Sequence, residues 1–417
     1  TMREDLEKFF NGNGEGNEVK LHGKICVKMN SIGSFTVGTT CIKGMVKIIR
    51  PNMVIDGSDA EIEAEVDDCT TSDWALFFLT PSARCVQFKN MNVRVHIRNL
   101  HACTRKFAIF YNTAFGIKFE NCRLELLSEK QLNLMGIYNN GNLDTHMETR
   151  ADNLVINDCF IKTECWAEEF SKECRVYGLY NNLANSISVQ NTFLYATNRG
   201  EGEKQSAIGV YTNGRFGRFV GNNIKANGCH NKGMEKEQAH ACGFINEGLY
   251  SLISSNNIVG EWGGRCVGLE TSGEYTIVSG NKILSTHTIS GRSVVSRGNC
   301  SEIIGNVLTS TSRNARLLDL NAENCIISQN IMAVLMAPEE CQSGCGIYAA
   351  GEYTRGNSIT ENIIRNVRDA GLFISREAGT VHNNMVYSYP QTVRQAYSDD
   401  AILRDRLDER HIRSIRE

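Results

Sequence analysis

Residues 266–284 read CVGLETSGEYTIVSGNKIL, and the second half of this stretch recurs along the chain. A short run of β-branched residues leads to an asparagine, here Asn281, and apolar residues follow it. The equivalent positions are Asn90, Asn121, Asp158, Asn191, Asn222, Asn256, Asn281, Asn306, Asn330, Asn362 and Asn384. Successive copies lie 22 to 37 residues apart. A repeat of this length without long amphipathic segments predicts a β-solenoid.

The recurring asparagine has a structural explanation. Asn and Asp tolerate the left-handed backbone of a tight bend and bond nearby backbone groups. When coils stack in register, such side chains also hydrogen-bond from one coil to the next. We therefore interpret this position as part of the scaffold and not as a binding site.

With this asparagine ladder, the chain resembles the right-handed parallel β-helix proteins of the pectate-lyase-like superfamily over about residues 40–390. The resemblance implies an all-β fold of about 11–12 coils with three strands in each coil. One strand ends at the ladder asparagine, one follows it, and the third precedes the next repeat. Members of the superfamily usually bind saccharide on the outer face of the third strand.

Both ends of the sequence depart from the repeat. We expect an N-terminal cap segment at 1–17 with a short helix, a β-helix domain at 18–391, and a charged helical tail at 392–417. A solenoid needs both ends covered, which explains a cap at each. The tail alternatively docks a neighbouring copy and so makes a homo-oligomer.

Composition narrows the classes of partner. The net charge is -3 with no basic block, which argues against nucleic acid, and the apolar runs are too short to cross a membrane. Many of the 16 cysteines lie within apolar strand-like phrases, where they act as small buried residues. With no visible signal peptide, these features predict a reduced, cytoplasmic protein; a trimmed signal would make it secreted.

The phrases of the third strand share a pattern of glycine, apolar residue and tyrosine, as in GIY and GVY. Strand alternation predicts that the apolar residue points inward and that the other two face solvent. The glycine column then marks either close packing or a floor for a ligand. The third column reads Tyr111, Tyr138, Tyr180, Tyr211, Ile245, Glu270, Ser296, Asp319, Tyr348 and Phe373.

Two carboxylates, Glu270 and Asp319, interrupt the aromatic column, and Glu247 projects from the coil before Glu270. Glu270 and Asp319 are two coils apart, so their backbones should be separated by about 10 Å. At that separation their side chains can act as an acid and a base with water between them. Glu247 is then a nucleophile or a partner that perturbs the pKa of Glu270. A solvated acidic patch paired with nearby arginines is the structural alternative.

We predict that Tyr180, Tyr211, Tyr348 and Arg297 bind the substrate, since sugars present C–H faces to flat aromatic rings. The same tyrosines also suit a stabilising cross-strand ladder, which we favour for Tyr111 and Tyr138. The set Cys229, His230, His240 and Cys242 matches no standard zinc finger, so we expect no metal.

These residues predict a carbohydrate-active enzyme, a glycoside hydrolase or glycosyl-transferring enzyme that acts on oligosaccharides without a cofactor. The stretch quoted above is loosely similar to coils of inulin fructotransferases. A second possible function for the same fold is that of a lyase or epimerase that acts on uronic-acid polymers. Its activity would depend on Arg297 or on a calcium ion. The third alternative is a non-catalytic saccharide-binding or structural β-solenoid.

Overall fold

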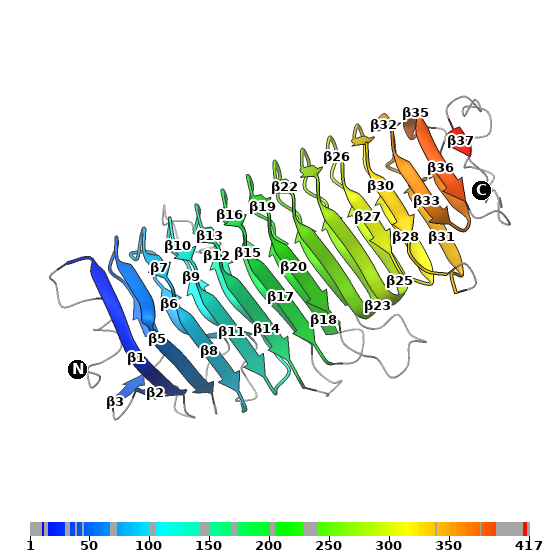
Figure 1. The fold of residues 1–417 in the computed structure, drawn as a ribbon. Helices are drawn as coiled ribbons and strands as arrows, with labels where there is room; N and C mark the ends of the chain where they lie inside the picture. The colour runs from blue at the N-terminus through cyan, green and yellow to red at the C-terminus, as the bar shows by residue number, and fades with distance from the viewer. Residues whose placement is uncertain are drawn as a thin grey trace. The chain divides into compact units, whose positions relative to one another are not determined.

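The computed structural model describes residues 11, 16–29, 34–37, 40–43, 46–66, 73–99, 106–141, 151–167, 173–200, 205–228, 240–337, 340–375, 377–388 and 412–414. The chain divides into two compact units, Thr1–Arg218 and Phe219–Glu417. In each unit, strands of successive coils pair in parallel (Figure 1). Connections between parallel strands of one sheet are right-handed in nearly all proteins. The predicted right-handed parallel β-helix is therefore confirmed, whereas the segment boundaries 1–17, 18–391 and 392–417 stay predictions.

Unit 1 begins with the long strand β1 (Glu18–Met29), which pairs in parallel with β5 (Val54–Val66) and antiparallel with β2 (Ser34–Val37); β2 pairs in turn with β3 (Thr40–Lys43). Three rows of stacked strands follow. The row before the bend holds β7 (Gln87–Lys89), β10 (Lys118–Glu120), β13 (Val155–Asn157) and β16 (Ser188–Gln190). The row after it holds β8 (Asn92–Ile97), β11 (Arg123–Ser128), β14 (Phe160–Cys165) and β17 (Phe193–Asn198). The third row holds β4 (Val46–Ile48), β6 (Asp73–Leu79), β9 (Lys106–Asn112), β12 (Asn133–Asn140), β15 (Cys174–Asn182) and β18 (Gln205–Thr212).

Unit 2 repeats the three rows, and β19 (Arg218–Val220) contains the boundary between the units. The row before the bend holds β22 (Leu252–Ser254), β24 (Ile277–Ser279), β26 (Glu302–Ile304), β29 (Ile326–Ser328), β32 (Asn357–Thr360) and β35 (Gly379–His382). Past the bend lie β20 (Asn223–Asn227), β27 (Val307–Ser310), β30 (Ile331–Val334), β33 (Ile363–Val367) and β36 (Asn384–Ser388). The third row holds β21 (His240–Asn246), β28 (Asn314–Leu320), β31 (Ser343–Ala349) and β34 (Ala370–Ile374). The long strands β23 (Asn257–Thr271) and β25 (Lys282–Ser296) run through both of the last two rows.

The recurring asparagines occupy two different columns at the bend. In unit 2 they lie inside the coil and form a ladder, in which each Nδ2 donates to the next Oδ1 at 2.9 to 3.0 Å. The members are Asn222, Asn256, Asn281, Asn306, Asn330, Asn362 and Asn384. The preceding residue takes the left-handed conformation there, as at Gly280 and Gly305. The predicted ladder is confirmed for this unit.

In unit 1 the predicted alignment is wrong by one residue. Its polar members are the left-handed bend residues themselves, with φ between 48° and 54°: Asn90, Asn121, Asp158 and Asn191. The inward ladder position is taken by Cys122, Cys159 and Thr192. The Cys122 N–H donates to Cys159 Sγ at 3.4 Å and the Cys159 N–H to Thr192 Oγ1 at 3.2 Å. Sulfur and hydroxyl thus replace the amide oxygen as coil-to-coil acceptors.

The glycine column of the third strand faces the interior. The register is unchanged on either side of Gly268, from Val267 opposite Arg292 to Leu269 opposite Val294, so Gly268 lies beside Ser293 of the next coil. A Cβ at Gly268 would lie 2.3 Å from Cγ2 of Ile283 on the facing strand and 2.7 Å from the Ser293 carbonyl oxygen. Close packing therefore explains the glycines, and the interpretation of this column as a solvent-facing ligand floor is wrong.

The predicted terminal helices are not part of the described structure. The cap helix lies outside the described residues. Within the predicted tail the structure describes Ile412–Ser414, which form β37 and pair in parallel with β36. These three residues are a strand because they continue the stacking of a solenoid row, so the helical prediction is wrong there. In the described part of the chain, no helix is long and apolar enough to span a membrane.

The twelve cysteines whose side chains are described are free thiols, most of them buried. Burial raises the pKa of Cys266 and of Cys345 to about 12, so neither forms a thiolate at neutral pH. We expect a thiol reagent to react slowly with the native protein and to count most of the 16 cysteines after unfolding without reductant. Six or more disulfides in that titration would contradict the prediction of a reduced protein.

Candidate functional site

One outward column of unit 2 brings the predicted acids together. Glu270 of β23 pairs with Val295 of β25, which pairs with Asp319 of β28. Asp319 pairs with Tyr348 of β31, and Tyr348 with Phe373 of β34. The prediction that Glu270, Asp319 and Tyr348 share a column is confirmed. Ser296 was misplaced by one residue: β23 and β25 pair without a register shift, so Leu269 lies opposite Val294 and Glu270 opposite Val295.

Each acid is held by arginines. Arg297 NH1 forms an ion pair with Glu270 Oε1. Asp319 Oδ2 accepts from Arg292 Nε at 2.9 Å and from Arg316 NH1 at 3.1 Å. The acidic side chains are 19% and 18% exposed. These partly exposed ion pairs fix the direction of both carboxylates.

The two ion pairs diverge from one coil. Arg292 and Arg297 flank Val295 in sequence, and one reaches forward to Asp319 while the other reaches back to Glu270. Val295 lies between the two acids in the column and is 2% exposed. The acids therefore lie on either side of Val295, about 10 Å apart along the stack.

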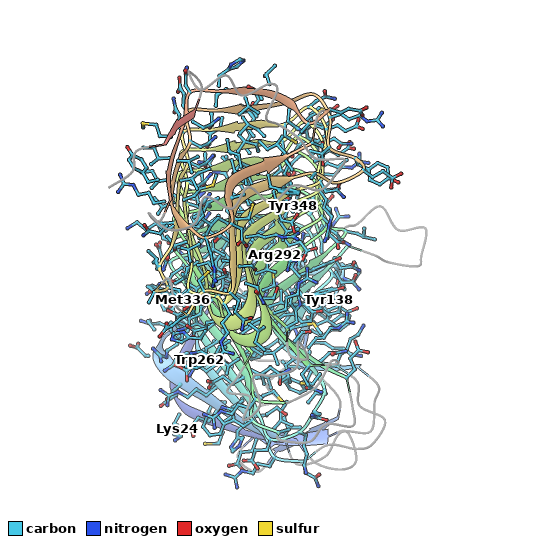
Figure 2. The ribbon with its side chains drawn as sticks, turned by 90° about the vertical axis from the view of Figure 1, so that its right-hand side faces the viewer. Lys24, Tyr138, Trp262, Arg292, Met336 and Tyr348 are labelled. Carbon is cyan, nitrogen blue, oxygen red and sulfur yellow. The ribbon has the colours of Figure 1, made fainter. Side chains whose placement is uncertain are left out.

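Tyr348 is fixed between two neighbours. The guanidinium of Arg316 lies 3.9 Å from its ring centre on the preceding coil, and Phe373 stacks 5.1 Å away on the next coil with 3° between the ring planes. Because these coils lie on opposite sides of Tyr348, both ring faces are occupied. Its hydroxyl and ring edge remain for a ligand, so Tyr348 suits an edge contact better than a sugar-stacking platform (Arg292 and Tyr348 are labelled in Figure 2).

Glu247 lies outside the acidic column. It is exposed and follows by two residues Ile245, the register partner of Glu270. It therefore belongs to the coil before Glu270, in the neighbouring outward position. The predicted adjacency of coils is confirmed, and a role as nucleophile stays a prediction.

Tyr180 and Tyr211 belong to unit 1, where they continue a column of aromatic rings. The centroid distances along Phe78, Tyr111, Tyr138, Tyr180 and Tyr211 are 5.2, 4.8, 5.3 and 4.8 Å. Tyr177 packs edge-on against Tyr180, and the burial of Tyr177 raises the pKa of Tyr177 to about 12. This column is a cross-strand ladder, as favoured for Tyr111 and Tyr138. Substrate binding by Tyr180 and Tyr211 stays a prediction.

Sequence reasoning missed Arg292. It lies in the column that runs Cys242, Val267, Arg292, Arg316 and Cys345, where two arginines on adjacent coils interrupt less polar side chains. The arginine of the phrase GRSVVS was a visible signal, but only the structure shows that its side chain reaches Asp319. Of the set considered for zinc, Cys229 and His230 lie outside the described residues. The described residues hold no group of three His, Cys, Asp or Glu placed to bind a metal.

The coils and their register define a right-handed parallel β-helix protein. Comparison with protein-family models finds no match, and comparison with curated protein sequences finds none either. Among solved structures, the Dettilon tailspike protein matches at a TM-score of 0.40 and 10% identity, over 90% of this chain and 55% of that one. A mannuronic acid specific polysaccharide family 6 lyase enzyme from human gut microbiota matches at 0.40 and 9%, over 99% and 89%. The chain thus spans about half the length of the tailspike.

Proposed function

We propose that the protein is a carbohydrate-active enzyme that cleaves or transfers glycosidic bonds on the outer third-strand face of unit 2. The observation that supports this most is the column in which Glu270 and Asp319 stand two coils apart with Arg292, Arg297 and Arg316 around them. Their backbone separation of about 10 Å is compatible with a carboxyl separation of roughly 6.5–9.5 Å, the range for an acid and a base with water between them.

The ion pairs favour different roles for the two acids. Asp319 is held by two guanidiniums, which orient its carboxylate as a base that receives a proton from the attacking water. Glu270 has one arginine, and that arginine is 47% exposed. When Arg297 turns to an anionic group of the substrate, Glu270 is free to carry a proton to the departing glycosidic oxygen. Water then forms the new bond to the anomeric carbon as the old C–O bond breaks.

A second candidate is elimination on a uronic-acid polymer. The three arginines around the column favour it, because guanidinium groups bind sugar carboxylates bidentately. In that reaction the bound carboxylate is neutralised by arginine, a base removes the adjacent C–H proton, and the glycosidic oxygen leaves. The product carries a new C=C bond that absorbs ultraviolet light.

A product assay separates these candidates. Purified protein is incubated with panels of neutral and uronate-containing oligosaccharides, while new reducing ends and ultraviolet absorbance are followed. We expect new reducing ends or transferred glycosyl groups without an absorbing product. An absorbing product supports elimination instead. Binding without any cleavage across both panels contradicts the proposed enzyme and supports a non-catalytic saccharide-binding protein.

A further inference from the structure

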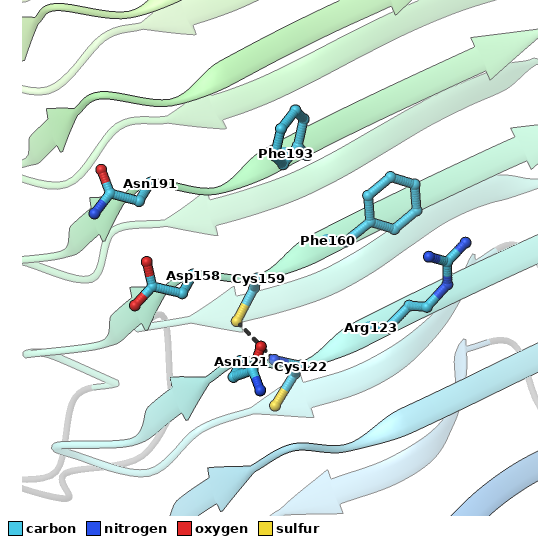
Figure 3. A pocket seen from close by; sticks show the side chains of 8 residues that line it. All are labelled: Asn121, Cys122, Arg123, Asp158, Cys159, Phe160, Asn191 and Phe193. Atoms are coloured by element: carbon cyan, nitrogen blue, oxygen red, sulfur yellow. Dashed lines mark hydrogen bonds between the residues drawn. The ribbon is translucent and has the colours of Figure 1, made fainter.

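Unit 1 contains a hollow at its bend that lies outside the third-strand face. It has a volume of about 380 Å³ and is lined by three neighbouring coils (Figure 3). Each coil contributes a left-handed bend residue on one rim and the first residue of the next strand on the other. The rims are Asn121, Asp158 and Asn191 on one side and Arg123, Phe160 and Phe193 on the other. The buried Cys122 and Cys159 lie between them.

The aromatic rim offers an open ring. Phe160 and Phe193 are register partners with centroids 6.3 Å apart, and Phe193 is 44% exposed. Arg123 places its guanidinium 4.5 Å from the ring centre of Phe160, so that end of the rim is closed. A ligand that reaches this rim therefore meets Phe193 first.

The opposite rim offers hydrogen-bonding groups. Asn121 donates its Nδ2 to Asn90 at 2.8 Å and keeps its Oδ1 as an acceptor. The side chains of Asp158 and Asn191 make no hydrogen bond or ion pair with the described residues. A flat apolar ring facing a few convergent polar groups is the usual composition of a small-molecule site.

The charges select among ligands. Arg123 is already paired with Glu125, so its charge is offset. Asp158 is the remaining ionised group of the lining, and it repels anions. The hollow therefore disfavours a uronate, in contrast to the arginine-rich column of unit 2.

We propose that this hollow is a second carbohydrate-binding site, for an uncharged saccharide. The C–H face of one sugar packs on Phe193, and its hydroxyls donate to Asp158 and bond the amides of Asn191 and Asn121. The site holds no catalytic pair, since Asp158 is the one carboxylate in its lining. It serves to retain a polymer on the protein.

Isothermal titration calorimetry with neutral gluco-, manno- and galacto-oligosaccharides tests this site. We expect Phe193→Ala to weaken binding about tenfold or more, because it removes the stacking ring. Asp158→Asn should weaken binding severalfold without changing the melting temperature, because Asn occupies the same left-handed position in the neighbouring coils. Phe216→Ala is the matched control, since Phe216 is an exposed phenylalanine elsewhere in unit 1.

The result is separable from the proposed catalysis. Binding that survives Glu270→Gln combined with Asp319→Asn, but fails in Phe193→Ala, supports the second site even if no reaction is found. The proposal is overturned if Phe193→Ala and Phe216→Ala bind alike, or if no neutral saccharide binds the parent. Binding of an oligogalacturonate alone, lost in Phe193→Ala, overturns the assigned ligand class.

Discussion

Glu270→Gln is expected to lower turnover by roughly 10²–10⁴-fold while the fold and substrate binding persist, because the amide cannot donate the proton that a general acid supplies. The substitution is nearly isosteric, so the side chain keeps its place beside Arg297. Turnover and KM on a substrate that the parent cleaves, together with the melting temperature, measure the three effects separately.

Asp319→Asn should behave alike, and the double variant should fall well short of additive, because the two residues act as one unit. The parent should show a bell-shaped pH–rate profile that loses one limb in a single variant. Glu302→Gln is the matched control, since Glu302 lies on β26, outside the third-strand row. Near-parental turnover in both single variants would place the catalytic site elsewhere.

Asn281→Ala is expected to lower the free energy of unfolding by about 1–3 kcal/mol, because it leaves buried polar groups without partners. Asn281 is 1% exposed. Its Oδ1 accepts from the backbone N–H of Asn256 at 2.8 Å and from the Nδ2 of Asn256 at 3.0 Å. Its own Nδ2 donates to the Ile253 carbonyl at 2.8 Å and to Asn306 at 3.0 Å. Urea unfolding followed by circular dichroism measures the change.

The two columns of asparagine make a sharp control. Asn121→Gly should be nearly neutral, because glycine tolerates the left-handed backbone and the side chain is exposed. Asn281→Gly should destabilise at least as much as Asn281→Ala. Equal stabilities for Asn121→Gly and Asn281→Gly would mean that the ladder assignment of the two units is wrong.

The sequence predicts the fold well because every repeat carries the local residue pattern that one coil requires. Each bend needs a residue that tolerates a left-handed backbone, and each strand needs alternating inward residues, so both recur in every coil. The same alignment misassigned Asn121, because asparagine serves equally as a bend residue and as a ladder residue. Only the burial of Cys122 and Asn222 tells the two columns apart.

The sequence predicts only part of the candidate site. The sequence by itself determined that Glu270 and Asp319 interrupt an aromatic column two coils apart, because equivalent residues of successive coils lie directly above one another. Strands β23 and β25 pair at a constant offset of 25 residues, which equals the spacing of Asn256 and Asn281, so the repeat already places Val295 opposite Glu270. The tertiary structure decided that Arg292 and Arg297 reach in opposite directions, to Asp319 and to Glu270. The long guanidinium side chains cross between columns, and the spacing of the repeat does not encode the direction in which they reach.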